Sequence, residues 1–153
     1  MAGPRPRQPA TERLLTRPAP TPAALLAVAL GGALGGTLRW WLGDIAPDGP
    51  GFPWTTFAIN VSGSLVLALL PLVALVRARP ALAVGLGPGL LGGYTTLSAY
   101  AEQGRSFLAD GRPALAATYL AGTLVACLVA VTLAGRLSNG ASRAAFAAED
   151  GNE

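Results

Sequence analysis

Four long apolar stretches, separated by short polar links, make up most of this chain. They cover residues 23–42, 54–76, 81–108 and 113–137. The hydrocarbon core of a bilayer is about 30 Å thick, so a helix that crosses it needs about 20 mostly apolar residues. Each of the four stretches meets this requirement. The pattern therefore predicts an all-α membrane protein with four transmembrane helices.

The third stretch differs from the others because glycine and proline interrupt it. Residues 85–93 read GLGPGLLGG, and Thr95, Thr96 and Ser98 follow directly. Proline removes a helix hydrogen bond, so we expect the third helix to be broken here, with backbone carbonyls freed inside the bilayer. Such backbone is tolerated only where it is buried in protein or lines a cavity. Unwound carbonyls of this kind are also good ligands for a cation.

The two ends of the chain are polar and divide it into three parts. Residues 1–22 are rich in Pro and Arg and cannot bury enough apolar surface to order themselves, which predicts a disordered tail. Residues 23–137 form the predicted transmembrane domain, and residues 138–153 form a polar tail that ends in acidic residues. The composition agrees with a membrane protein: 12% of residues are charged, about half the share in soluble domains.

The arginines indicate how the chain is oriented. All eleven basic residues are Arg, and with four spans both tails and the link after the second span lie on one side. That side holds eight of them and the other side holds three: Arg39, Arg105 and Arg112. The excess favours cytoplasmic tails in a multi-pass protein of the cell membrane. No basic patch interleaved with aromatic residues is present, so nucleic acid is not an expected partner.

The sequence argues against an enzyme. It contains no His and a single cysteine, Cys127, so neither a disulfide nor a cysteine–histidine metal site is available. No pairing of a nucleophile with a base is visible. Cys127 lies in an apolar run, where we interpret it as a small packed or pore-side residue.

Two polar residues stand out within the apolar stretches. Asn60 lies well inside the second stretch, where an amide is costly unless it bonds a neighbouring helix or faces a water-filled path. Arg39 lies near the end of the first stretch, beside Trp40. Its side chain either extends to the membrane interface or places a positive charge at a vestibule that attracts anions.

Two spacings predict helix faces. Gly31 with Gly35, and Gly32 with Gly36, form overlapping pairs of small residues that let helices approach closely. In the last stretch, Tyr119, Thr123 and Cys127 recur every fourth residue and so share one helix face. This polar stripe either holds helices together or lines a path for a polar solute.

Taken together, these residues resemble the Fluc/CrcB family of fluoride channels. The resemblance covers about residues 24–137. It rests on three motifs in order: Gly31-Gly32 with Gly35, Arg39 and Trp40 in the first stretch, Asn60 with Gly63-Ser64 in the second, and residues 92–100, GGYTTLSAY, in the third.

The resemblance implies an antiparallel, dual-topology-type dimer with two pores that carry fluoride passively out of the cytoplasm and so lower its toxicity. It also implies a structural sodium ion, which is not transported and is held by the backbone carbonyls of Gly92 and Thr95. Arg39 would lie in the vestibule. The implied fluoride path consists of Asn60, Thr96, Leu97, Ser98, Tyr100, Tyr119 and Thr123, in which Leu97 and Tyr100 stand at the positions of an aromatic box.

The chain departs from the family pattern at Leu97, where the family has Phe, and at Ala99, where Ser or Thr is usual. Its arginine excess on one side suggests that the chain inserts mainly one way and pairs with an oppositely oriented relative. A second copy of the chain is the other possible partner. Two other functions stay open. The chain could be a non-conducting or partner-dependent subunit of a heterodimeric channel. A small multidrug-type transporter is the other, but it would need an acidic residue inside the first span, which carries Arg39 instead.

Overall fold

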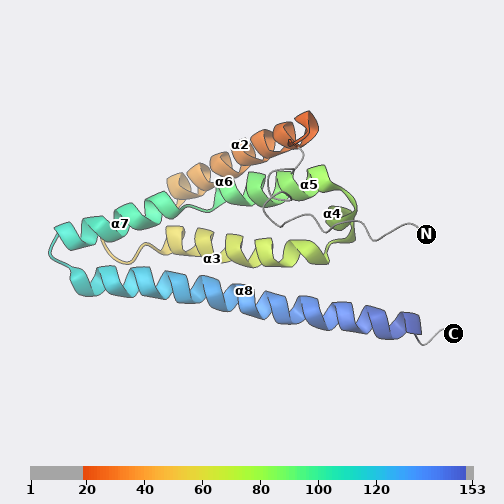
Figure 1. Ribbon diagram of the computed structural model, residues 1–153. Coiled ribbons are helices and arrows are strands. Elements are labelled where there is room, and N and C mark those ends of the chain that lie inside the picture. Colours follow the sequence, from red (N-terminus) through yellow and green to blue (C-terminus); the bar gives the residue numbers. More distant parts are fainter. Residues whose placement is uncertain (1–18, 151–153) are drawn as a thin grey trace, which may run out of the picture.

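The computed structural model of the protein describes residues 19–150, with side chains described as far as residue 137. The described part is helical and contains no strand, which confirms the all-α prediction (Figure 1). Predictions about residues 1–18 and 151–153 lie outside the described residues. The elements are α2 (Pro22–Ile45), α3 (Trp54–Leu69), η1 (Leu70–Leu72), α4 (Ala74–Ala78), α5 (Pro80–Val84), η2 (Gly85–Leu91), α6 (Gly92–Tyr94), α7 (Leu97–Ala109) and α8 (Pro113–Asp150).

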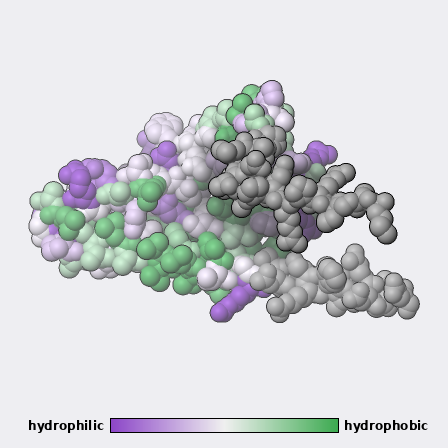
Figure 2. Space-filling model, viewed as in Figure 1, coloured by the Kyte–Doolittle hydropathy of each residue, from purple (hydrophilic) through white to green (hydrophobic). Residues whose placement is uncertain are grey.

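Three of the predicted spans form helices long and apolar enough to cross a membrane: Pro22–Ile45, Trp54–Leu72 and Pro113–Leu137. Their large apolar side chains remain exposed, and Figure 2 shows such side chains gathered on the surface over α8. A soluble domain would bury such a surface, so the chain is a membrane protein. The third predicted span is divided among α5, η2, α6 and α7, so a fourth span stays a prediction.

Two helix boundaries differ from the sequence prediction. The second stretch was expected to continue through residue 76, but α3 ends at Leu69 and is followed by the short η1 and α4. Pro71 lies in η1, and because proline has no N–H and clashes with the preceding turn, the helix stops there. At the other end, α8 continues past the expected limit at residue 137 to Asp150.

The break in the third stretch lies after the glycine–proline segment and not within it. Residues Gly85–Leu91 form a π-helical segment that includes Pro88, and α6 continues it to Tyr94. The chain leaves the helix only at Thr95 and Thr96, whose backbone is extended. The glycines do interrupt the α-helical winding, but the unwound backbone that was expected at them lies at Thr95 and Thr96. Wider π-helical winding accommodates the missing proline donor, and packing against α2 holds the glycines in place.

Glycines on both partners allow α2 to touch η2 and α6 through backbone atoms. A Cβ added at Gly31 would overlap the carbonyl oxygen of Gly85, and one added at Gly35 would overlap the carbonyl oxygen of Leu90. From the other side, a Cβ at Gly93 would lie 2.5 Å from the carbonyl oxygen of Gly32. The predicted small-residue face of Gly31 and Gly35 is thus a helix contact, whereas Gly36 faces open space.

The remaining helices pack along α8. Figure 1 shows α3 and α7 lying beside α8, with the turn between α7 and α8 at one end of the molecule. Tyr119 of α8 is fully buried at their junction, and its ring meets those of Phe52, Tyr100 and Phe107 at centroid distances of 5.4, 5.3 and 6.1 Å. This aromatic cluster fixes α7 against α8.

Gly35→Ala is expected to lower the free energy of unfolding by about 1–3 kcal/mol, the usual cost of overpacking, because a backbone carbonyl blocks the new methyl group. Gly36→Ala is the matched control on the same helix, since nothing lies within 4 Å of its added Cβ. Both variants are heated in detergent, and size-exclusion chromatography then measures the fraction of folded protein that remains at each temperature. The two curves give the difference in stability. Equal losses of stability would contradict the proposed close contact.

Candidate functional site

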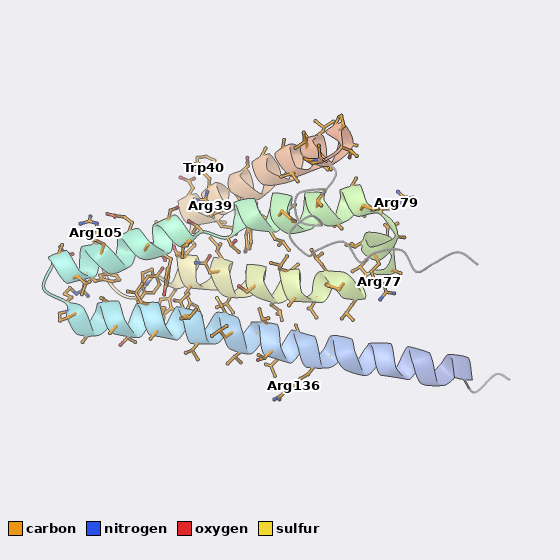
Figure 3. The ribbon with its side chains drawn as sticks, viewed as in Figure 1. Arg39, Trp40, Arg77, Arg79, Arg105 and Arg136 are labelled. Carbon is orange, nitrogen blue, oxygen red and sulfur yellow. The ribbon has the colours of Figure 1, made fainter. Side chains whose placement is uncertain are left out.

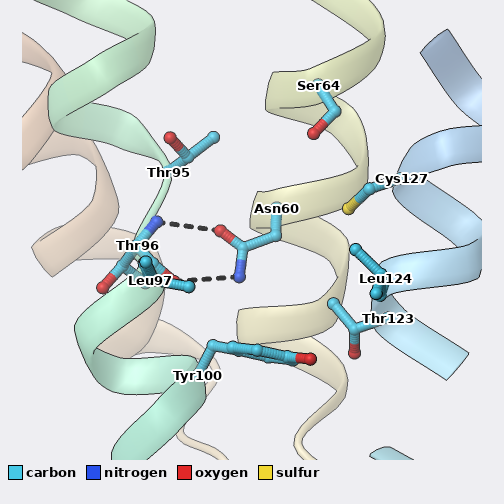
Figure 4. Close-up of a pocket in the computed structure, with 9 residues that line it drawn as sticks. All are labelled: Asn60, Ser64, Thr95, Thr96, Leu97, Tyr100, Thr123, Leu124 and Cys127. Carbon is cyan, nitrogen blue, oxygen red and sulfur yellow. Dashed lines mark hydrogen bonds between the residues drawn. The ribbon is translucent and has the colours of Figure 1, made fainter. Parts of the chain in front are cut away.

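The side chain of Asn60 joins α3 to the break in the third stretch. Its Oδ1 accepts a hydrogen bond from the Thr96 N–H at 2.8 Å, and its Nδ2 donates to the Thr96 carbonyl at 3.1 Å. Both bonds are drawn in Figure 4. Asn60 is 9% exposed, so it is shielded from water. The amide therefore replaces both backbone hydrogen bonds that Thr96 loses where the helix is interrupted.

Thr96 also starts the next helix. As the N-cap residue of α7, its Oγ1 accepts a hydrogen bond from the Ala99 N–H at 3.1 Å. This bond satisfies one of the free donors at the helix start. The Ser98 hydroxyl lies 3.2 Å from the same oxygen. Asn60 thus holds the residue that sets the position of α7.

A cavity of about 220 Å³ lies beside this contact, between α3, the break and α8 (Figure 4). Five residues of the predicted fluoride path line it: Asn60, Thr96, Leu97, Tyr100 and Thr123. Ser64, Thr95, Leu124 and Cys127 complete the lining. Sequence positions from three separate stretches therefore meet at one cavity.

Two residues of the predicted path do not line this cavity. Ser98 is exposed on α7. Tyr119 is buried behind Tyr100, and its hydroxyl donates to Oε1 of Gln103 at 2.7 Å. Of the predicted stripe on α8, the structure places Thr123 and Cys127 on the cavity.

The polar groups around the cavity differ in whether they still have a hydrogen-bond donor that no protein group uses. The Tyr100 hydroxyl donates to the Leu120 carbonyl at 2.6 Å, so its proton is already used. Asn60 uses one of the two Nδ2 hydrogens and keeps the other. The Thr123 hydroxyl is buried and has no hydrogen-bond partner among the described residues, while the residue as a whole is 3% exposed. An unpaired buried hydroxyl is costly, and Figure 4 shows this oxygen on the side of Tyr100.

A second cavity, of about 350 Å³, contains Arg39. Trp40, Asp44, Asp48, Thr55 and Thr96 are among the residues that line it. The Arg39 Nε donates to the Gly93 carbonyl at 3.2 Å, and Figure 3 shows Arg39 and Trp40 near the end of α2. Of the two positions considered for the Arg39 side chain, the structure thus favours the one in which it lines a cavity. Thr96 lines both cavities and so lies between them.

A polar network near the second cavity was missed by sequence reasoning. The Asp48 carboxylate accepts hydrogen bonds from the Thr55 N–H at 2.7 Å and from the Thr56 N–H at 3.1 Å, which caps the start of α3. Gln103 of α7 donates to the same carboxylate at 3.1 Å and accepts from Tyr119. This network joins the loop before α3 to α7 and α8. The sequence did offer one signal: Asp48 comes a few residues before α3, and the residue at the N-cap position itself has no capping side chain.

The predicted sodium ligands flank α6: Gly92 is its first residue and Thr95 follows its last. In an uninterrupted α-helix the Thr96 N–H would bond the Gly92 carbonyl, but here it donates to Asn60. The Thr95 carbonyl follows the last helical residue, Tyr94, and carbonyls at a helix C-terminus carry partial negative charge. These backbone oxygens fit a hard monovalent cation. Residues 19–137 contain no group of His, Cys, Asp and Glu side chains that could hold a metal instead.

Comparison with known proteins extends over most of the chain. Residues 26–135 match the family described as "CrcB-like protein, Camphor Resistance (CrcB)". The fluoride-specific ion channel FluC 2 of Nocardia farcinica is 43% identical over 129 residues, which are 80% of this chain and 91% of that protein. FluC 1 of Streptomyces coelicolor is 44% identical over 115 residues, which are 70% of this chain and 71% of that protein.

A third relative, the fluoride-specific ion channel FluC of Anaeromyxobacter sp. (strain K), is 42% identical over 71% of this chain and 89% of its own length. The family match includes the stretches that contain Arg39, Asn60, the break at Thr95 and Thr96, and α8 as far as residue 135. The resemblance inferred from three short motifs is thereby confirmed over residues 26–135. The chain belongs to the CrcB family.

Proposed function

We propose that this chain is a subunit of a fluoride-selective channel, which lets fluoride leave the cytoplasm down its gradient and so lowers its toxicity. Its relatives are named as ion channels and not as enzymes. In this chain, the observation that carries the proposal is the cavity beside Asn60, which the side chains of Asn60 and Thr123 line together with Tyr100.

Fluoride is small and strongly hydrated, so a narrow pore must replace its water with other hydrogen-bond donors. Asn60 and Thr123 supply such donors without breaking another bond. The hydroxyl of Tyr100 is occupied by the Leu120 carbonyl, so this residue offers the positive edge of its ring instead. Leu97 has no ring and offers no such edge.

Arg39 supplies the attraction at the entrance. Its guanidinium lies on the second cavity, where an anion that approaches the Asn60 contact would meet it. Asp48 lines the same cavity, but its carboxylate is engaged by the two N–H groups at the start of α3. The partial positive charge of these N–H groups offsets part of the repulsion between the carboxylate and fluoride. Asp44 also lines this cavity, so Arg39 must outweigh two carboxyl groups there.

The proposed assembly is an antiparallel dimer of four-span chains in the plasma membrane. In a single chain Leu97 is 77% exposed although it lines the cavity, so a partner is needed to close this side. The partner is a second copy or an oppositely oriented relative. A sodium ion at the dimer centre would be held by the Gly92 and Thr95 carbonyls, and it would neutralise the carbonyl dipoles at the ends of the two α6 helices.

The purified chain alone, reconstituted into liposomes, is expected to release fluoride at least about tenfold faster than chloride. The physical reason is that the cavity offers few donors, and these match one small, dehydrated anion. Fluoride-sensitive and chloride-sensitive electrodes measure the two effluxes. Protein prepared and assayed with sodium replaced by a large organic cation is expected to lose the fluoride efflux.

Other outcomes of this experiment would contradict different parts of the proposal. Equal release of fluoride and chloride would contradict selectivity, and undiminished flux without sodium would contradict the sodium site. If the chain alone releases neither ion, adding an oppositely oriented relative distinguishes the remaining functions. Restored flux would indicate a heterodimer, and no flux would indicate a non-conducting subunit.

Asn60→Asp is expected to reduce fluoride efflux by more than about tenfold. A carboxylate of the same shape still accepts from the Thr96 N–H, but it places a negative charge about 4 Å or less from the proposed path, which costs about 4 kcal/mol at an effective dielectric of 20. The same liposome assay measures the loss. Thr118→Ala is the control and should conduct as the wild type does, because this exposed hydroxyl bonds only the Ala114 carbonyl of its own helix. A folded Asn60→Asp variant with normal flux would place the path elsewhere.

Reporter fusions at the two tails are expected to find most molecules with both tails in the cytoplasm. Eight arginines favour that side and three favour the other, which biases insertion. A reporter active only in the cytoplasm and one active only outside measure the two populations. Equal populations would contradict the bias and would favour a partner identical to this chain.

A further inference from the structure

An apolar groove with one charged residue lies along the contact between α2 and the third stretch. Its volume is about 400 Å³, and it shares no lining residue with the two cavities described above. Arg79 is the one polar side chain on its described lining, and the other lining residues are alanine, glycine and leucine. The proposed fluoride path and its entrance make no use of this groove.

The close contact between the helices explains why a groove is present. Gly31 and Gly85 have no side chain and Ala27 has a single side-chain carbon, so the space beside their backbones stays open. The lining residues of α2 extend from Ala27 to Leu34, which corresponds to about 10 Å along the helix axis. Among the lining residues of the third stretch, Arg79 comes first, just before α5. It therefore lies at one end of the groove.

The groove is open to the surroundings of α2. Leu34, which lines it, is 64% exposed, and Leu30 on the preceding turn is 58% exposed. Because α2 is long and apolar enough to cross a membrane, these side chains face lipid. An unfilled apolar space loses the van der Waals contacts of its lining atoms. The acyl chain of a lipid, which is as apolar as leucine, is the molecule at hand to fill it.

Charges are distributed unequally between the two ends of the helical domain. The carboxylates among residues 19–137 lie in the last turn of α2, in the loop after it, in α7 and in the turn before α8; they are Asp44, Asp48, Glu102 and Asp110. At the opposite end, Figure 3 shows Arg77 and Arg79 in the link before α5. The guanidinium of Arg79 forms no hydrogen bond or ion pair within the described part of the chain. Its charge is therefore available to an anion from outside the protein.

We propose that this groove binds an anionic phospholipid, with an acyl chain between α2 and η2 and the phosphate on Arg79. A guanidinium pairs with a phosphate through two parallel N–H bonds, and basic pockets between transmembrane helices bind anionic head groups. The arginine count favours the cytoplasm for this end of the chain, and the cytoplasmic leaflet carries the anionic lipids. Such a lipid stabilises the contact of α2 with α5, because it touches both helices.

The test compares two lipids that share their acyl chains and differ in head-group charge. Purified protein in a neutral detergent is mixed with dioleoyl phosphatidylglycerol or dioleoyl phosphatidylcholine, and native mass spectrometry measures the fraction of protein with lipid bound. The anionic lipid is expected to bind at least about fivefold more tightly, which is the contribution of one arginine near anionic lipid. Glycerol phosphate, which has a phosphate and no acyl chain, is expected not to displace it.

Variants separate the groove from a general attraction to a basic surface. Arg79→Gln is expected to reduce the preference for the anionic lipid to below about twofold. Arg77→Gln is the matched control, since Arg77 lies in the same link, lines a different cavity and already donates to the Pro71 carbonyl at 3.2 Å. It is expected to keep most of the preference. Ala81→Trp fills the groove at an exposed position and is expected to weaken the binding of both lipids.

Several results would overturn the inference. If the wild type binds no anionic lipid, or binds the two lipids equally, the groove does not select a charged head group. Equal effects of the two arginine variants would indicate attraction to the surface as a whole, and unchanged lipid binding by a folded Ala81→Trp variant would place the acyl chain elsewhere. Displacement by glycerol phosphate would indicate a site for phosphate alone. None of these measurements depends on fluoride flux, so failure of the proposed function is distinguishable.

Discussion

The structure depends on one side chain that completes the hydrogen bonding of an interrupted helix. A bilayer offers no water to unpaired backbone groups, so each must find a partner within the protein. At Thr96 the N–H and the carbonyl both lose their helical partners, and the amide of Asn60 supplies an acceptor and a donor at 2.8 and 3.1 Å. Few side chains other than a primary amide can do both. The start of α7, and with it the position of Tyr100, follows from this contact.

Several polar groups around the cavity are hydrogen-bonded in pairs. Tyr119 is paired with Gln103, Tyr100 with the Leu120 carbonyl, and Asp48 with the start of α3. These pairs make a rigid frame around the cavity. Within that frame, the second Asn60 hydrogen and the Thr123 hydroxyl stay available. Rigid surroundings with a few free donors are suited to holding a dehydrated anion, since little has to rearrange when it arrives.

Sequence reasoning succeeded where one local property decides the outcome. Continuous apolar character predicted α2, most of α3 and the membrane part of α8, and an amide at membrane depth singled out Asn60. It failed where the outcome depends on a distant partner. The glycines of η2 were expected to break the helix, but α2 holds them in π-helical turns. The capping role of Asp48 had a local signal, but its contact with Gln103 of α7 depends on how far-apart segments fold together and could not be read from the sequence around it.

The contact of α2 with η2 and α6 has a consequence for how this protein can change over evolutionary time. At Gly31 and Gly35 the neighbour is a backbone carbonyl, which is present whatever residue the partner position encodes. No second mutation in the partner's side chain can therefore make room for a methyl group. Ordinary helix interfaces drift by compensating changes of size, but this one cannot. Surviving descendants should keep these two glycines while the lipid-facing residues around them are freely exchanged.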